Sequence, residues 1–326
     1  MGINPSISIL IPNFNGNTLL MRNLPSVLIC SRQYAGISEI IVIDDASTEG
    51  GMDEIKTIFK TIRFLQNKTN ICFSEAINTG VKAASGDLIF LLNSDVSPEG
   101  SAMNKLANFF SQEDIFSVSP LILDEDNNPN IYSWNLRAFS RGKFSRQKWD
   151  LMTAKKLAET HQLPTLYSSG GSMMARKKMF QSLQGFDAIF YPFYFEDQDL
   201  GARAWRKGWR SLFCPEVIVE HQRKGSIQSA VPAWKVKLIQ RRNSFIFEWI
   251  HLGILKLLFY RLPRYLKQIL TRGLRGDWKF LLGFFLAIML LPKVIIRRFA
   301  NSPNKRYDNV VQQINREVSN LKATAK

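Results

Sequence analysis

SISILIPNFNG, at residues 6–16, is the first of three short apolar runs that decide the fold. The other two are EIIVIDD at residues 39–45 and LIFLLNSD at residues 88–95. Aliphatic runs with little polar alternation are typical of strands buried on both faces of a parallel sheet. Longer amphipathic runs separate them, so the sequence predicts an α/β fold with a mainly parallel, doubly wound sheet. The predicted helices span residues 19–29, 53–59, 74–84 and 102–110, and further strands are predicted at 63–65 and 115–121.

Polar residues follow each of these strands at the point where it ends. Ligands of doubly wound sheets bind beyond the carboxyl ends of the strands, so we expect these residues to form one site. A nucleotide base needs an aromatic platform and a group that reads its edge, and Phe14 and Asp45 offer both. A carboxylate there suits the imino N–H of uracil or thymine. Taken alone, Phe14 also suits a core position, and Asp44-Asp45 suits a turn with a helix cap.

Asp95 directly follows the apolar strand at residues 88–92. A carboxylate at a strand end is placed to hold Mg²⁺ or Mn²⁺ against a diphosphate, although an Asp at such a junction also suits the N-cap of a helix. His221 closes a predicted strand at residues 216–220 and is a second metal ligand if that strand runs beside Asp95. Otherwise the histidine has a structural role.

A dense aromatic run precedes a cluster of carboxylates in FYPFYFEDQDLGARAWRKG, at residues 190–208. The spacing of Asp199 and Arg203 and the glycine at position 208 predict a helix after the aromatic run. Asp197, at the start of that helix, is placed to accept a proton from a hydroxyl group. The structural alternative is that Asp197 only caps the helix.

Six segments, in this order, resemble the family 2 glycosyltransferases of GT-A fold, particularly the bacterial branch that makes surface polysaccharides and rhamnose-type glycans. The resemblance covers about residues 6–226. Any one segment is a weak signal, but six in one order are specific. The segments are ISILIPNFNG, EIIVIDDAST, NICFSEAINTGVKAASGDLIFLLNSDV, SSGGSMMARKKMFQSLQGFD, FYFEDQDLGARAWRKGW and HQRKGS.

The resemblance implies a metal-dependent, inverting transfer of a sugar from a nucleotide diphosphate, with UDP or dTDP favoured, to a hydroxyl of a lipid-linked or polysaccharide acceptor. It implies that Asp197 is the catalytic base and that Phe14 and Asp45 hold the nucleotide base. Asp95 and His221 would be the metal ligands. Further donor-binding residues are expected at Pro12, Asn15, Asp44, Asn78, Gly80 and Ser94, and acceptor or lid residues at Gly170, Gly171, Glu196, Arg223 and Ser226.

Two positions depart from the family pattern. The metal-binding motif reads Asn93-Ser94-Asp95 and keeps a single carboxylate, so modest metal affinity is expected. Cys72 stands where a glycine is usual, which affects the geometry near the diphosphate.

The basic excess of the chain lies in its C-terminal third. The net charge is +16, but residues 1–222 carry 22 Lys/Arg against 23 Asp/Glu, whereas residues 223–326 carry 21 against 4. We therefore expect a transferase domain at residues 1–226 and a separate basic, amphipathic helical region at 227–326. The three cysteines are far apart in apolar surroundings, which favours reduced thiols in the cytoplasm.

Two apolar runs, at residues 244–263 and 280–296, lie among these basic residues. The longest uninterrupted stretch, residues 280–291, is shorter than the ~20 residues that a membrane-spanning helix needs. We expect helices that lie on an anionic membrane surface at its cytoplasmic face, peripheral or shallowly inserted. A helical cap on the core, or a homo-oligomer contact, is the alternative.

Three other functions are weighed against transfer. Nucleic-acid binding is disfavoured because the cations flank long aliphatic runs instead of stacking aromatics. A nucleotidylyltransferase needs a glycine-rich, basic phosphate loop after its first strand, and residues 12–16 do not form one. A catalytically inactive, nucleotide-binding membrane scaffold remains open. The irregular residues 122–165 are expected to border the acceptor and to carry specificity.

Overall fold

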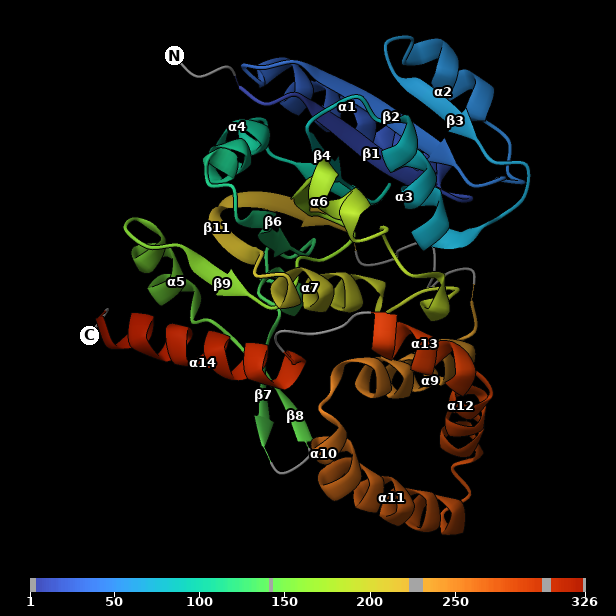
Figure 1. Cartoon of the computed structure of the whole chain (residues 1–326). Helices are drawn as coiled ribbons and strands as arrows, with labels where there is room; N and C mark the ends of the chain where they lie inside the picture. Colours follow the sequence, from blue (N-terminus) through green and yellow to red (C-terminus); the bar gives the residue numbers. More distant parts are fainter. Residues whose placement is uncertain (1–3, 141–142, 223–230, 301–305, 325–326) are drawn as a thin grey trace.

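A single twisted sheet forms the centre of the protein, as a computed structural model shows (Figure 1). The structure describes residues 4–140, 143–222, 231–300 and 306–324. Within these ranges the main sheet has the strand order β3-β2-β1-β4-β10-β6-β11-β5, and β9 pairs with residues 211–213 near the start of β11. Helices cover both faces of this sheet, which confirms the predicted α/β fold.

The N-terminal half is a parallel βαβ unit, as predicted. Strands β3, β2, β1 and β4 pair in parallel, so the carboxyl ends of β1 and β4 lie at the same edge. Its elements are β1 (Ile7–Asn13), α1 (Asn17–Gln33), β2 (Ser38–Asp44), α2 (Met52–Ile58), β3 (Arg63–Gln66), α3 (Cys72–Ala83) and β4 (Leu88–Leu91).

The second half of the sheet is mixed. Strand β10 runs antiparallel to both β4 and β6, and β5 runs antiparallel to β11, while β6 and β11 are parallel. These elements are β5 (Val96–Pro98), α4 (Ala102–Ala107), η1 (Asn108–Ser111), β6 (Ile115–Leu123), η2 (Ile131–Ser133), β7 (Leu136–Ser140), β8 (Lys143–Gln147), α5 (Leu151–Ala158), β9 (Leu163–Thr165), β10 (Met174–Arg176), α6 (Lys177–Ser182), η3 (Ala188–Phe190), α7 (Glu196–Arg206) and β11 (Arg210–His221).

Side chains of the central strands alternate between two apolar cores because successive residues of a strand point to opposite faces. In β1, Ile9 and Ile11 pack with α1 and α4, whereas Leu10 packs with α3 and α6. All three side chains are buried. Burial on both faces explains why this strand reads as an uninterrupted apolar run.

The described residues of the C-terminal region form helices joined by short connections. It contains α9 (Ala233–His251), α10 (Ile254–Lys256), a π-helical turn η4 (Leu257–Arg261), α11 (Leu262–Leu274), α12 (Trp278–Met289), α13 (Leu291–Ala300) and α14 (Tyr307–Thr324). None of these helices is by itself both long and apolar enough to cross a membrane. Only α12 and α13 taken together, with a bend of 60° between them, reach that length and apolarity.

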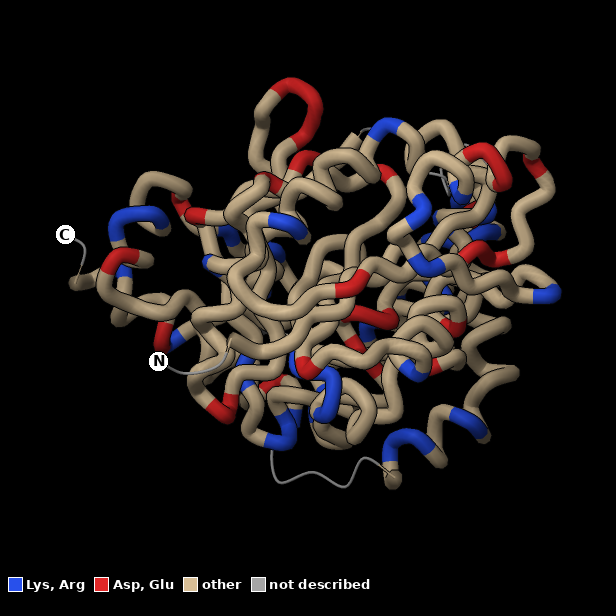
Figure 2. The backbone as a smooth tube through the Cα atoms, turned by 90° about the horizontal axis from the view of Figure 1, so that it is seen from above, with Lys and Arg blue, Asp and Glu red and all other residues tan. Residues whose placement is uncertain are grey.

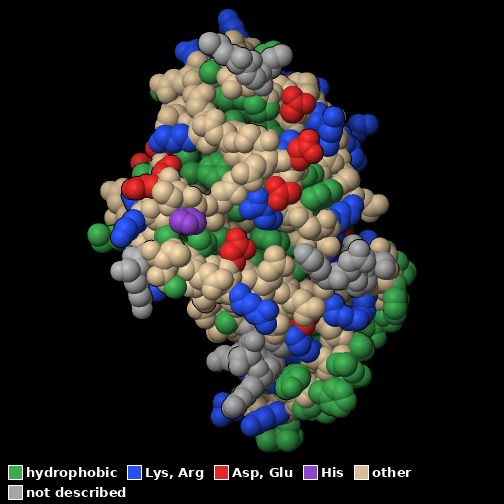
Figure 3. Space-filling view, turned by 60° about the vertical axis from the view of Figure 1, so that its left-hand side comes forward, with side chains coloured by type: hydrophobic (Ala, Val, Ile, Leu, Met, Phe, Trp, Pro, Cys, Tyr) green, Lys and Arg blue, Asp and Glu red, His purple; other side chains and the backbone are tan. Residues whose placement is uncertain are grey.

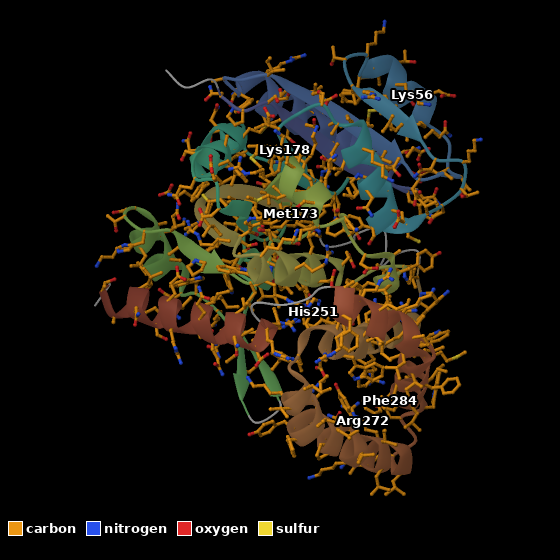
Figure 4. All side chains as sticks on the ribbon, in the orientation of Figure 1. Lys56, Met173, Lys178, His251, Arg272 and Phe284 are labelled. Atoms are coloured by element: carbon orange, nitrogen blue, oxygen red, sulfur yellow. The ribbon has the colours of Figure 1, made fainter. Side chains whose placement is uncertain are left out.

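These helices share a core with the α/β part. Phe245 of α9 and Val311 of α14 belong to the same apolar cluster as Trp205 of α7 and Phe213 of β11. Helix α14 turns back beneath the sheet and contacts α7, β7 and β9 (Figure 1). In Figure 4, His251 at the end of α9 lies at the junction, while Phe284 and Arg272 lie among the outer helices. The C-terminal helices are therefore positioned to contribute to a site in the α/β part.

Candidate functional site

A cavity of about 540 Å³ lies beyond the carboxyl ends of β1 and β4. We call it the donor cavity. The polar and aromatic residues predicted at the strand ends meet here, since its lining includes Pro12, Phe14, Asp45, Ser94 and Asp95. The other walls come mainly from the start of α3, the loop after η3, and helix α9. They include Cys72, Phe73, Tyr191, Phe193, Lys235, Leu238, Ile239 and Arg242.

Asp45 and Phe14 form the end of the donor cavity that suits a nucleotide base. Asp45 is buried, and its Oδ1 atom accepts hydrogen bonds from Asn67 Nδ2 at 2.8 Å and from the Ile71 amide at 3.0 Å. These two bonds fix the carboxylate while its second oxygen remains able to accept from a ligand. A partly exposed aromatic ring and a fixed acceptor are what recognition of a base edge requires.

Asp95 and His221 lie side by side because β5 and β11 pair, with His221 opposite Val96. His221 Nε2 is 3.6 Å from Asp95 Oδ1, too far for a good hydrogen bond. Asp95 Oδ1 is buried and has no hydrogen-bond partner, and burial raises the pKa of this carboxyl group. A buried, unpaired carboxylate oxygen beside an imidazole fits a divalent cation. In the described ranges, no cluster of three or more His, Cys, Asp or Glu side chains is arranged to hold a metal.

Four predicted donor residues do not line the donor cavity. Asn15 Oδ1 accepts from the Thr48 amide at 2.8 Å, and Asp44 Oδ1 accepts from the Ser47 amide, so both side chains hold the loop after β2. Asn78 exchanges two hydrogen bonds of 3.0 Å with the backbone of Phe186. At Gly80 an added Cβ would lie 2.8 Å from Ile43 Cδ1, so this glycine lets α3 approach the sheet. Arg223 and Ser226 lie outside the described residues.

Cys72 adopts a backbone conformation that suits the glycine usual at this position of the family. Its φ is +64°, in the left-handed region that favours glycine, and a non-glycine residue there carries strain on the order of 1 kcal/mol. Its thiol also lines the donor cavity. The substitution keeps the glycine-like backbone and adds a sulfur atom to the wall.

A second cavity, of about 610 Å³, contains Glu196 and Asp197 at the start of α7. We call it the acceptor cavity. The hairpin of β7 and β8 forms one wall and helix α9 forms another. The lining includes Tyr132, Trp134, Arg137, Arg146, Lys148, Tyr167, Tyr194, Gln198, Lys237, Gln240, Arg241 and Ser244. Residues of the ranges 131–137 and 146–148 thus border this cavity, and both ranges lie in the irregular segment 122–165.

Asp197 has the electrostatic setting of a general base. Burial raises its pKa to about 6, although amide hydrogen bonds from Gln198 and Gly170 and the charge of Arg137 oppose this shift. The Gln198 amide donates to Asp197 Oδ1 at 2.7 Å. Burial and the adjacent Asp197 raise the pKa of Glu196 to about 8. At neutral pH, Asp197 is therefore ionised and can accept a proton, while Glu196 is mostly protonated.

Gly170 and Gly171 lie between the two cavities. The Gly170 amide donates to Asp197 in the acceptor cavity, and the Gly171 carbonyl accepts from the amide of Asn93, which lines the donor cavity. A Cβ added at Gly171 would lie 2.7 Å from Asn93 Nδ2. This close approach brings the end of β4 and the start of α7 together, so the two cavities adjoin.

Helix α9 separates the cavities with two of its faces. Lys235, Leu238, Ile239 and Arg242 line the donor cavity, and Lys237, Gln240, Arg241 and Ser244 line the acceptor cavity. Each set has the spacing i, i+3, i+4, i+7 of one helix face. These residues were not predicted as site residues, because the composition of residues 227–326 indicated a separate membrane region that includes α9. The available signal was the polar and basic face formed by Lys237, Gln240, Arg241 and Ser244.

A buried asparagine of α9 fixes the loop that precedes Asp197. Asn243 of α9 is fully buried, and its Nδ2 donates to the carbonyls of Phe190, Phe193 and Tyr194 at 2.8–3.0 Å. Tyr194 and Phe195, just before α7, have φ of +70° and +80°. Asn243 therefore holds a strained loop that precedes Asp197.

Behind α7, His251 joins the C-terminal region to this helix. Arg206 donates to His251 Nδ1, and the Nε2–H of His251 donates to Asp199 Oδ1 at 2.7 Å. Asp199 also forms a buried ion pair with Arg203 at 2.6 Å. Burial lowers the pKa of His251, so the ring is neutral at neutral pH and this tautomer is fixed by its two neighbours.

Comparison with known structures identifies the fold. GalNAc-T7 in complex with UDP, GalNAc and Mn²⁺ superposes with a TM-score of 0.59 and 19% identity, over 78% of this chain and 50% of that one. The mannosyltransferase PcManGT of Pyrobaculum calidifontis, in complex with GDP-Man and Mn²⁺, superposes with a TM-score of 0.52 and 14% identity, over 89% and 76% of the two chains. The superposition thus spans half of GalNAc-T7. These likenesses confirm the GT-A architecture.

Sequence comparison identifies the family. The chain is 23% identical over 207 residues to the N-acetylglucosaminyl-diphospho-decaprenol L-rhamnosyltransferase of Mycobacterium tuberculosis, covering 57% of this chain and 67% of that protein. It is 33% identical over 106 residues to the poly(ribitol-phosphate) β-N-acetylglucosaminyltransferase TarP of Staphylococcus aureus, covering 32% of each. The model of the family described as glycosyltransferase like family 2 matches residues 5–242. The predicted resemblance is confirmed, and the chain belongs to glycosyltransferase family 2.

Proposed function

We propose that the protein transfers a sugar from a nucleotide diphosphate, UDP or dTDP in preference, to a hydroxyl group of a lipid-linked or polysaccharide acceptor, with inversion at the anomeric carbon. One observation carries the proposal. A cavity with a base-recognition end and an unpaired buried carboxylate adjoins a second cavity that contains a carboxylate with a pKa of about 6. Donor and acceptor thus have separate sites, and these sites meet at the catalytic base Asp197.

The donor would lie with its base at Phe14 and Asp45 and its diphosphate toward Asp95. Lys235 and Arg242 of α9 line the same cavity, where their charges would face the phosphates. The residues present fit Mg²⁺ or Mn²⁺, since Asp95 Oδ1 has no partner and His221 Nε2 is 3.6 Å away. Held there, a divalent cation would neutralise charge on the departing nucleoside diphosphate.

Asp197 would take the proton of the acceptor hydroxyl as its oxygen attacks the anomeric carbon from the face opposite the leaving group. Attack from that face in a single displacement inverts the configuration. The bond from the anomeric carbon to the diphosphate breaks, and the electron pair leaves with the nucleoside diphosphate. Glu196, protonated at neutral pH, would not compete for the hydroxyl proton.

The test of this assignment is Asp197→Asn, with Asp53→Asn on the exposed face of α2 as the control. A general base contributes roughly 10²- to 10⁴-fold to the rate, so the first variant should lose at least a hundredfold in turnover while its affinity for the donor nucleotide is unchanged. Turnover is followed as release of nucleoside diphosphate from labelled donor with a bacterial membrane-lipid extract as the acceptor source. Near-normal turnover of Asp197→Asn would rule out its role as the base.

The outer C-terminal helices carry an exposed apolar face that we assign to an anionic membrane surface. Leu262, Leu266, Leu270 and Leu274 recur every four residues along α11 and are 45%, 60%, 65% and 82% exposed. Figure 3 shows apolar side chains gathered over the lower end of the molecule, where these helices lie. Basic and acidic positions are interspersed over much of the backbone in Figure 2, but residues 223–326 contain only four acidic residues.

An apolar stripe flanked by cations suits the boundary between lipid headgroups and acyl chains. The exposed Lys267 and Arg275 lie on α11 and just after it, and Lys293 lies on α13. Peripheral attachment at the cytoplasmic face would bring a lipid-linked acceptor to the enzyme. The free, mostly buried cysteines are compatible with a reducing compartment.

Vesicle flotation tests this surface. The protein should float with phosphatidylserine vesicles at low salt, bind phosphatidylcholine vesicles far less, and lose binding in Leu266→Ser/Leu270→Ser. The control is Ile29→Ser/Ile37→Ser, which changes two exposed isoleucines of the α/β part. If the protein binds neither kind of vesicle and dimerises through the leucine stripe, this face is instead a homo-oligomer contact.

A further inference from the structure

The acceptor cavity contains more positive charge than proton transfer requires. Its basic side chains are Arg137, Arg146, Lys148, Lys237 and Arg241, whereas Glu196 and Asp197 are its carboxylates. A neutral saccharide is bound by aromatic rings and by amide groups. The cavity has those as well, including Tyr132, Trp134, Gln198 and Gln240. The cations therefore need a different explanation.

Two of the arginines are placed where they repel each other. Arg137 of β7 and Arg146 of β8 are directly opposite in the antiparallel pair, so their side chains share one face of the hairpin. Like charges in this position destabilise a hairpin unless an anion joins them. The guanidinium of Arg146 lies 5.7 Å from the ring centre of Tyr132, and Arg137 donates to the Tyr167 hydroxyl. These aromatic contacts orient the two guanidinium groups without neutralising them.

Internal counter-charges are scarce. Arg241 is paired with Asp277 at 2.8 Å. The other four cations form no salt bridge with a carboxylate in the parts of the chain that the structure describes. Glu196 does not offset them at neutral pH, because burial and Asp197 raise its pKa to about 8. Asp197 is ionised, and its charge acts on Arg137, so it offsets one cation. The remaining cations leave the cavity with a net positive charge beside Asp197.

We propose that this cavity binds a phosphate or diphosphate group of the acceptor, held between Arg137 and Arg146 of the hairpin and Lys237 of α9. This inference rests on the proposed function, which assigns this cavity to the acceptor. Guanidinium groups bind phosphate oxygens through parallel N–H donors, and an ammonium group adds a point charge from the facing wall. The acceptor hydroxyl would then meet Asp197 in the same cavity.

Two kinds of acceptor carry such a group. One is a saccharide linked to a lipid through a diphosphate, and the other is a polymer joined by phosphodiester bonds. Both would place anionic oxygens against the same three cations. Only the first would also engage the leucine stripe of α11.

The experiment measures the melting temperature of the full chain with inorganic pyrophosphate in the presence of EDTA, which removes metal from the donor cavity. Pyrophosphate should raise the melting temperature of the wild type, and its affinity should fall at least tenfold in Arg146→Glu/Lys237→Glu. Both residues are exposed, so the variant should fold. The control Lys60→Glu/Lys178→Glu makes the same charge change at two exposed residues that do not line the cavity, and it should respond as the wild type does. Figure 4 shows Lys178 on the α/β part.

Further arms identify the source and separate the two proposals. A short polyprenyl diphosphate that stabilises the wild type selects the lipid-linked acceptor, and an oligomer of glycerol phosphate that does so selects the polymer. The manganese–UDP shift is measured in the same variants and should be retained, since it reports the donor cavity. If manganese and UDP do not raise the melting temperature of the wild type, the donor assignment alone is overturned. The phosphate subsite is overturned if none of the three phosphates stabilises the wild type, or if the double variant responds as strongly as the control.

Discussion

The donor cavity and the acceptor cavity adjoin, yet they are built in different ways. The donor cavity takes much of its chemistry from residues at or just after the ends of β1, β2 and β4, all within residues 12–95, and from one face of α9. The acceptor cavity is assembled from the β7–β8 hairpin, the start of α7 and a second face of α9, over residues 131–244. Each cavity is lined by two carboxylates, but the donor cavity is otherwise mainly apolar and aromatic, whereas the acceptor cavity is rich in cations.

This difference indicates where each specificity is encoded. A strand end fixes a side chain by local sequence, so Asp45 and Asp95 can be recognised from short motifs. The acceptor wall depends on a hairpin and a helix that meet only in the folded chain. We therefore expect donor chemistry to be shared broadly among related enzymes and acceptor choice to vary with residues such as Arg146 and Lys237.

The largest effect is expected at Asn243, because it holds the loop whose residues line both cavities. Asn243→Ala would remove the amide that satisfies three buried carbonyls before α7. Buried groups left without partners cost roughly 1–3 kcal/mol each, so the free energy of unfolding should fall by about 3 kcal/mol and the melting temperature by on the order of 5–10 °C. Donor and acceptor affinity should weaken together.

The matched control is the exposed Asn309→Ala of α14. Thermal unfolding followed by circular dichroism gives both melting temperatures. Equal stability of the two variants would mean that the loop does not depend on α9 and that the cavities are independent.

Lowering the pH from 7 to 5 should reduce turnover, which depends on Asp197 in the acceptor cavity, by about tenfold. The raised pKa of Asp197, about 6, means that its carboxylate is lost as pH falls through that value. Turnover at pH 5 should thus be about one tenth of that at neutral pH. Nucleotide affinity in the absence of metal, measured by calorimetry at both values, should change much less, because binding of the base does not involve Asp197. A turnover that is constant from pH 5 to 7 would contradict the assignment of Asp197 as the base.

The smallest effect concerns the donor cavity alone. Cys30 and Cys214 are buried, and burial raises the pKa of each thiol to about 11, whereas Cys72 is partly exposed in the donor cavity. A maleimide should label Cys72 first. A nucleotide at three times its Kd, with Mn²⁺, should slow this labelling roughly fourfold by simple occupancy. Peptide mass spectrometry reads the site, and labelling that is equally fast with nucleotide would place the donor elsewhere.

The sequence was sufficient to predict the parallel strands β1 to β4 and to place Phe14, Asp45 and Asp95 at one edge of the sheet, because burial on both faces leaves a clear apolar pattern. It was not sufficient for β10, which is three residues long and antiparallel in the middle of the sheet. Nor did it reveal that α9 lines both cavities, because its polar periodicity was masked by a basic, apolar composition. Asn78 and Gly80 matched a family motif, yet their contacts hold α3 against its neighbours.

The most direct test of the account is the melting temperature of the full chain with UDP, dTDP, GDP and CDP, each with and without Mn²⁺ or Mg²⁺. We predict a metal-dependent rise with UDP or dTDP, on the order of 5 °C at a hundred times the Kd, and its loss in Asp95→Asn. A chain that no nucleotide stabilises, or an Asp95→Asn variant that responds as the wild type does, would contradict a donor site at the ends of β1 and β4.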